Sequence, residues 1–284
     1  MEKEEVLKHA IAGDINAFQT LFAGFQNQLK SYLYRLLTDR NDVDDLTHDT
    51  FIKAFSGIST FNQDSSIKTW VFTIATNLAY DHLRKVKRWQ PDAQDRGADL
   101  AIGSDEVKRA FWMVHDTSNA GAYEIKEHID FCFTCISKTL PIENQVALIL
   151  KDIYEFQIRE ISLILGKTEG VIKHLVNDAR STMTGIFEHR CALINKQGMC
   201  HQCSHINEIF NPKHNQQEQL MKLDLVKGSK KYNRDELFTL RTLLVRSIDP
   251  LHVSGTDLHE SIMQCVRTAI GENDFFERNG EKPG

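Results

Sequence analysis

The clearest pattern in the chain is a helical repeat of apolar positions between residues 65 and 85. Apolar side chains recur there every three or four residues, the spacing that lines one face of an α-helix. They are Ile67, Trp70, Val71, Ile74, Ala75, Leu78, Ala79 and Leu83. The densest basic cluster of the sequence follows directly, Arg84-Lys85-Val86-Lys87-Arg88-Trp89. Cations that hold phosphates and rings that stack on bases suit a nucleic-acid strand, although a solvated basic helix end is the alternative.

A second amphipathic pattern lies just upstream. Its apolar positions also repeat at three and four residues, and they are Val43, Leu46, Thr50, Phe51, Ala54 and Ile58. Asp42, Asp45 and Asp49 fall on another face of the same predicted helix. Like charges in a row destabilise a helix. The row therefore indicates a cationic partner surface, with a solvated face as the alternative.

Two helical units are predicted, one on each side of a polar stretch. Residues 16–37 are predicted to form one further amphipathic helix, which completes a first unit that ends near Trp89. Residues 91–122 contain Pro91 and several glycines and are predicted to be a linker with one short helix. In the second unit, two short helices meet at a turn over residues 157–180, which is the pattern of a helix-turn-helix.

Two of these segments together resemble a known family. The segments "DDLTHDTFIKAF" and "IKTWVFTIATNLAYDHLR" resemble region 2 of RNA polymerase sigma factors of the extracytoplasmic-function (ECF) group, over roughly residues 10–90. The helix-turn-helix, with Gly166 in its turn and Thr168 as helix cap, resembles sigma region 4. The resemblance implies an all-α protein of two small helical domains joined by a linker. The bounds we predict are region 2 at 1–90, linker at 91–122, region 4 at 123–190, a Cys/His segment at 191–215 and a helical C-terminal extension at 216–284.

The resemblance also implies a function and its residues. The chain is expected to bind core RNA polymerase and promoter DNA as an alternative sigma factor, through Asp42, Asp45 and Asp49 for polymerase. The expected −10 element contacts are Lys68, Asn77, Arg84, Lys85, Lys87 and Arg88. The expected −35 element contacts are Thr168, Glu169, Lys173, His174, Asn177 and Arg180. This recognition helix is less basic than is usual in the family, and we expect Asp178 to face away from DNA because it would repel phosphates.

The six cysteines follow a spacing of their own. Cys132 and Cys135 form one C-x2-C pair, and Cys191, Cys200 and Cys203 follow with three histidines interleaved. In a cytosolic protein such spacing favours metal or redox chemistry, so these five thiols are candidate ligands of a structural or regulatory zinc. The alternative for Cys132 and Cys135 is that they are buried free thiols. No cofactor is required for the predicted function.

Composition agrees with a partner-dependent factor. A chain of 284 residues with 41% hydrophobic residues can form about two domains. Its net charge of −5 argues against a protein that coats DNA alone, but not against one that binds DNA through a larger partner. The acidic N-terminus and the lack of a long apolar run predict a cytoplasmic protein without a membrane segment.

The remaining alternatives concern the extension and the function class. Residues 234–248 and 257–270 are predicted helices, whose apolar stripes suit either a regulatory extension that docks back on the chain or a dimerisation hairpin. An anti-sigma factor is a further candidate partner. Because no phosphate-binding glycine loop or hydrolase motif is present, the chain is not expected to be an enzyme. The rival functions are a stand-alone helix-turn-helix regulator with a metal- or redox-sensing cysteine cluster, and a zinc enzyme with ligands in residues 189–205.

Overall fold

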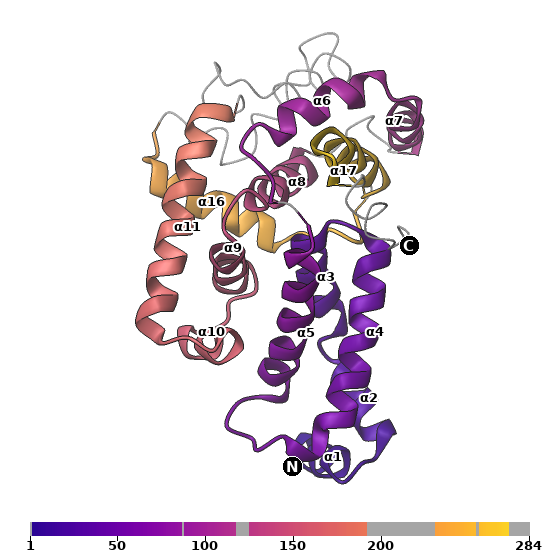
Figure 1. The fold of residues 1–284 in the computed structure, drawn as a ribbon, viewed down its shortest axis with the longest axis vertical. Helices are drawn as coiled ribbons and strands as arrows, with labels where there is room; N and C mark the ends of the chain where they lie inside the picture. The colour runs from indigo at the N-terminus through magenta and orange to yellow at the C-terminus, as the bar shows by residue number, and fades with distance from the viewer. Residues whose placement is uncertain (1, 87, 118–124, 192–230, 254–255, 273–284) are drawn as a thin grey trace. The chain divides into compact units, whose positions relative to one another are not determined.

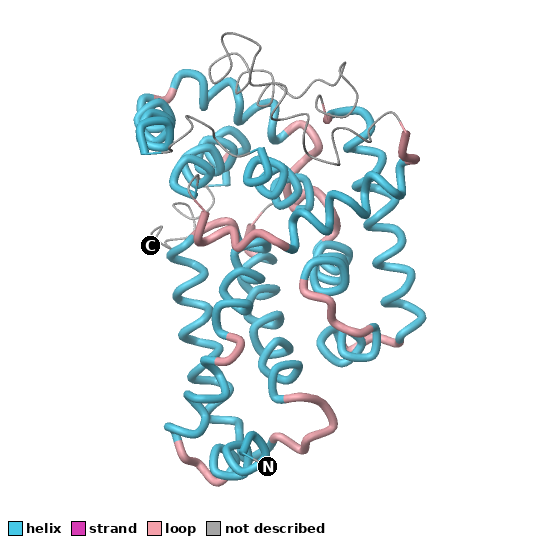
Figure 2. Tube along the Cα trace, turned by 180° about the vertical axis from the view of Figure 1, so that it is seen from behind, coloured by secondary structure: helices cyan, strands magenta, loops and turns pink. Residues whose placement is uncertain are grey.

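The computed structural model describes the chain except residues 1, 87, 118–124, 192–230, 254–255 and 273–284. Every element in the described part is helical, which confirms the predicted all-α class (Figure 2). The chain forms two compact units, Met1–Lys87 with Val146–Val176, and Arg88–Gln145 with Asn177–Pro283. This division differs from the predicted bounds because part of the helix-turn-helix packs with the N-terminal helices. None of the described helices is both long enough and apolar enough to cross a membrane.

The first unit begins with helices α1 (Glu2–Ile11), α2 (Ile15–Ala23), α3 (Gln26–Leu37), α4 (Arg40–Gly57) and α5 (Ile67–Arg84), with the short 3-10 turn η1 (Ile58–Thr60) before α5. Helices α3, α4 and α5 pack side by side (Figure 1). Asp14, Asp39 and Ser66 cap α2, α4 and α5 with side-chain oxygens that accept from backbone amides. The single helix predicted over 16–37 is wrong, because the chain breaks at Gly24 and Phe25 into α2 and α3.

Aromatic side chains form the core of this unit. The ring of Phe18 lies 5.2 Å from that of Phe51, and the ring of Tyr32 lies 5.3 Å from that of Phe72. The hydroxyl of Tyr32 is 2.8 Å from the hydroxyl of Thr76, which satisfies both polar groups inside the core. Burial of Tyr32 raises the pKa of its hydroxyl, so the group stays neutral and acts as a hydrogen-bonding anchor between α3 and α5.

The rest of the first unit comes from much later in the sequence. It comprises the end of α9 (Ile142–Leu148), a π-helical turn η2 (Ile149–Ile153), α10 (Ile158–Leu165) and the first part of α11 (Glu169–Arg190). The ring of Tyr154 meets that of Tyr32 edge-on at 5.9 Å, and Phe156 meets Phe72 at 4.9 Å. Residues 146–176 are therefore fixed to α3 and α5 by aromatic packing.

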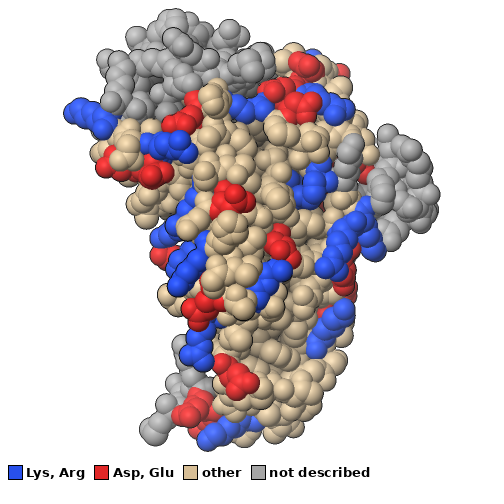
Figure 3. Space-filling model, turned by 60° about the vertical axis from the view of Figure 1, so that its left-hand side comes forward, with Lys and Arg blue, Asp and Glu red and all other residues tan. Residues whose placement is uncertain are grey.

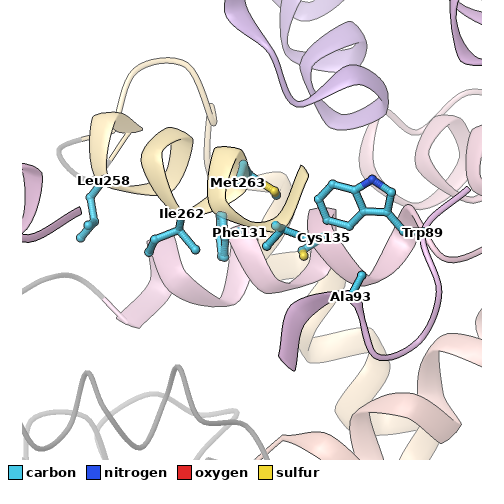
Figure 4. Packing of buried hydrophobic residues seen from close by; sticks show 8 residues of the cluster. Trp89, Ala93, Phe131, Cys135, Leu258, Ile262 and Met263 are labelled. Atoms are coloured by element: carbon cyan, nitrogen blue, oxygen red, sulfur yellow. The ribbon is translucent and has the colours of Figure 1, made fainter. Parts of the chain in front are cut away.

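The second unit joins the linker to the C-terminal extension. It contains α6 (Ala93–Gly103), α7 (Asp105–Thr117), α8 (Ile125–Ser137), the later part of α11, α16 (Arg234–Arg246) and α17 (Thr256–Ile270). Its core draws on segments far apart in sequence (Figure 4), and the buried residues are Trp89, Ala93, Phe131, Cys135, Leu258, Ile262, Met263 and Val266. The linker thus holds two helices where one short helix was predicted.

The buried face of α16 differs from the predicted stripe. Phe238, Thr242 and Val245 are buried. The apolar stripe predicted for residues 234–248 is only half-buried, and its members are Leu237, Leu240, Leu244 and Ile248. Arg241 also lies on the buried face, and its guanidinium lies 3.5 Å from the centre of the Phe187 ring. A buried arginine stacked on a ring is not selected by hydrophobicity, so the apolar pattern alone does not indicate this face.

Candidate nucleic-acid and polymerase interface

Helix α5 presents one polar stripe to solvent. Asn77, Asp81 and Arg84 follow each other at helical spacing and all three are exposed. Arg84 pairs with Asp81 at 3.3 Å and lies over the Tyr80 ring, and exposed Lys85 follows at the end of the helix. An exposed ion pair of this kind contributes little to stability, so the guanidinium can exchange partners at low cost. The stripe therefore offers an amide with a donor and an acceptor, next to two cations.

The loop before α5 lies at the start of the same stripe. Exposed Asn62 donates from its side-chain amide to Asp64, and Gln63 has a left-handed backbone with φ of 62°. Ser66 ends the loop by accepting from the amide of Thr69 at 3.0 Å. By helical spacing Ser66, Trp70, Thr73 and Asn77 share one side of α5. Loop and stripe therefore lie along the same side of α5, with the half-buried ring of Trp70 between their polar side chains.

Two of the predicted −10 residues lie elsewhere. Lys68 is half a turn from Asn77 around α5, and its ammonium lies 4.7 Å from the centre of the Phe156 ring. Burial lowers the pKa of Lys68, with Glu160 acting in the opposite direction. Arg88 donates to the carbonyl of Leu140 and to the side chain of Gln145, and burial lowers the pKa of its guanidinium to about 10. Lys68 thus lies on another side of α5 than Asn77, and Arg88 is held by partners within the second unit.

Lys87 lies outside the described residues. On the face drawn in Figure 3, Lys and Arg side chains alternate with Asp and Glu and form no broad basic field.

The acidic row on α4 is divided. Asp45 and Asp49 are exposed, whereas Asp42 is half-buried and its carboxylate lies 3.3 Å from Nε2 of His82 in α5. The neighbouring Asp44 pairs with Lys30 of α3 at 2.6 Å. The sequence pattern could not show the His82 contact, because the two residues lie forty positions apart in sequence. Asp45 and Asp49 remain as the exposed acidic pair of the row.

The helix-turn-helix has the predicted geometry. Glu160 completes a capping box at the start of α10, with the amide of Gln157 donating to its carboxylate at 2.8 Å. Gly166 ends α10 with φ of 61°, a left-handed conformation that glycine adopts without steric cost. Thr168 then caps α11 by accepting from the amide of Val171 at 3.4 Å.

Helix α11 presents most of the predicted −35 residues to solvent. The exposed ones are Glu169, Lys173, His174 and Asn177, while Arg180 is half-buried and Ile172 and Val176 are buried on the opposite side. Asp178 accepts from the side-chain amide of Asn144 at 2.8 Å. Asp178 is nevertheless exposed, so its orientation toward DNA stays a prediction.

The cysteines that the structure describes do not form a metal centre. Cys132, Cys135 and Cys191 are buried and not disulfide-bonded, with Cys135 inside the core of the second unit. The sulfur of Cys191 accepts from the Arg241 guanidinium at 3.2 Å. Among the described residues, no group of three or more His, Cys, Asp or Glu could hold a metal ion. Cys200 and Cys203 lie outside those residues.

Comparisons with known proteins agree with this geometry. Residues 21–89 match the family model Sigma-70 region 2. The chain is 22% identical over 182 residues to the RNA polymerase sigma-H factor of Pseudomonas aeruginosa, covering 64% of this chain and 92% of that protein. It is 26% identical over 178 residues to the ECF RNA polymerase sigma factor SigW of Bacillus subtilis, covering 62% of this chain and 92% of that protein. These matches confirm the resemblance drawn from the two sequence segments.

Among solved structures, the chain is similar to CnrH in its complex with the cytosolic domain of CnrY. The TM-score is 0.47 at 16% identity, and the match covers 66% of this chain and 98% of CnrH.

Proposed function

We propose that this chain, which belongs to the ECF group of the sigma-70 family, is an alternative sigma factor that binds core RNA polymerase and directs it to promoters. The match of residues 21–89 to sigma-70 region 2 carries the proposal. In this function the chain acts by binding and has no catalytic activity of its own. It works beside the polymerase in the cytoplasm.

The exposed surfaces suggest a division of roles. The acidic pair Asp45 and Asp49 on α4 suits a cationic surface of the polymerase. The polar stripe of α5 suits the −10 element, because an amide can pair with the edge of an unstacked base while Arg84 and Lys85 hold phosphates. The first turns of α11 suit the −35 element, since asparagine reads adenine and lysine reads guanine in the major groove.

Copurification with core RNA polymerase, followed by transcription from a supercoiled promoter library, tests this proposal. We expect the chain to bind the polymerase and to direct initiation from a defined subset of promoters that core polymerase alone ignores. Specific promoter binding by the chain without polymerase, and no effect of polymerase on it, would instead identify a stand-alone helix-turn-helix regulator.

We also propose a zinc site that uses Cys191, Cys200 and Cys203, on the strength of their spacing. Cys132 and Cys135 are weaker candidates, because Cys135 is enclosed by apolar side chains. Elemental analysis of anaerobically purified protein should find close to one zinc per chain, and Cys200→Ser with Cys203→Ser should remove it, whereas Cys265→Ser should not. Metal-free wild-type protein whose transcription ignores chelators would contradict this site.

A further inference from the structure

Helix α5, assigned to the −10 element, is in direct contact with α10, the first helix of the helix-turn-helix assigned to the −35 element. The hydroxyl of Thr69 in α5 donates to the carboxylate of Glu160 in α10 at 2.9 Å. Phe156, just before α10, packs on Phe72 of α5 and lies beneath the ammonium of Lys68. Thr69, Phe72 and Phe156 are all buried. The start of α5 and the first helix of the helix-turn-helix therefore form a packed interface.

This contact is incompatible with reading both elements at once. Positions −10 and −35 are separated by about 25 base pairs, which at about 3.4 Å per base pair is roughly 85 Å along B-DNA. Side chains of α5 and α10 are within hydrogen-bonding distance of each other. The conformation described here can therefore bind one element at most, and α10 must leave α5 before the second is reached.

Once α10 has left α5, the linker between them limits how far apart the two DNA-reading helices can lie. Helix α6 has 11 residues and α7 has 13. At about 1.5 Å per helical residue they cover roughly 36 Å at most, whereas the same residues in extended form cover roughly 80 Å. Folding of α6 and α7 therefore shortens the span available between the two DNA-reading helices by roughly 44 Å.

Helix α17 of the C-terminal extension packs along both linker helices (Figure 1). Trp89, at the start of the linker, donates its indole N–H to Glu272 just after α17 at 2.7 Å, and Arg96 donates to the carbonyl of Ala269. A Cβ at Gly97 would lie 2.3 Å from Cγ2 and 2.7 Å from Cα of Val266, so α6 and α17 touch almost at the backbone. An isolated helix as short as α6 is marginal in water, so α6 depends on this packing.

We propose that α17 is an intramolecular restraint that keeps the linker folded and short, and that its release from α6 favours simultaneous binding of both promoter elements. This inference rests on the proposed sigma function. The apparent affinity for a two-element promoter is then reduced by the fraction of molecules whose linker is released. The C-terminal extension thereby sets the activity of the chain without a separate inhibitor.

Gly97→Ala tests the restraint selectively. The added methyl collides with the backbone of Val266, whereas alanine itself favours the helical conformation of α6. Gly103→Ala is the matched control, because a Cβ at Gly103 meets no atom within 4 Å. In the full chain, Gly97→Ala should speed hydrogen exchange in α6 and α17 and raise transcription by core polymerase several-fold on promoters that need both elements. The control should match wild type, and Arg96→Ala should change both measurements in the same direction but less.

Three outcomes would overturn the inference. Unchanged exchange in Gly97→Ala would show that the packing does not hold the linker. Faster exchange in both Gly97→Ala and Arg96→Ala without any gain in transcription would show that release is not limiting. Failure of wild type, control and variants alike to transcribe or to bind polymerase would reject the proposed function itself, and the failure of wild type distinguishes this outcome from the other two.

Discussion

Replacing Asp45 and Asp49 with lysine is expected to lower affinity for core RNA polymerase by at least tenfold. Both carboxylates are exposed on α4, whereas the carboxylates of Asp44 and Asp42 pair with Lys30 and His82. Reversing two interfacial charges turns attraction into repulsion, which affects the association rate and the final complex. Lysine is a better helix former than aspartate, so α4 should stay folded. Binding is measured by titration of labelled chain with core polymerase at two salt concentrations.

Glu4→Lys with Glu5→Lys is the matched control for this experiment. It makes the same change in net charge at exposed positions of α1. A general effect of net charge would weaken binding equally in both double variants. Equal binding of wild type and the Asp45/Asp49 variant, with both helical by circular dichroism, would contradict a polymerase contact at this surface.

Much of the fold could be predicted from periodicity, because α4, α5 and the helix-turn-helix carry strong local signals. The predicted Ile67–Leu83 stripe corresponds to α5, in which Val71, Ala75 and Leu83 are buried. The cap at Thr168 and the turn at Gly166 also form as expected, since both depend on neighbouring residues. Local chemistry determines these features, so sequence alone identifies them.

Features set by distant partners could not be predicted in this way. The linker helix α6 has a weak pattern of its own and is completed by α17, more than 150 residues later in the chain. Arg88 was expected on the DNA surface because it follows a basic run, but Gln145 and the carbonyl of Leu140 hold it inside the protein. Lys68 was also expected to contact DNA, but its ammonium lies over the ring of Phe156. The sequence shows that such residues are basic, but it does not show which side chains or carbonyl groups they contact in the folded chain.

Replacement of Asn77 and replacement of Arg84 are expected to change promoter recognition in different ways. Asn77→Ala should change base preference at one position of the −10 element by about 1–3 kcal/mol, because an amide that pairs with a base edge is lost. Arg84→Ala should weaken all promoters by a similar factor and reduce the slope of log affinity against log salt by about 1, because one phosphate contact is lost. Both residues are exposed, so neither change should lower stability appreciably.

Randomised −10 sequences transcribed by polymerase carrying each variant distinguish these effects in one assay. Asn77→Asp keeps the shape of the side chain but removes its donor, so it should alter the same promoter position as Asn77→Ala while favouring a different base. Lys8→Ala removes an exposed cation of α1 and serves as the control for Arg84→Ala. If Asn77→Ala and Arg84→Ala weaken every promoter uniformly, Asn77 does not read a base. If both shift the same base preference, Arg84 contacts the base edge as well, and the separation between amide readout and phosphate binding along the α5 stripe is wrong.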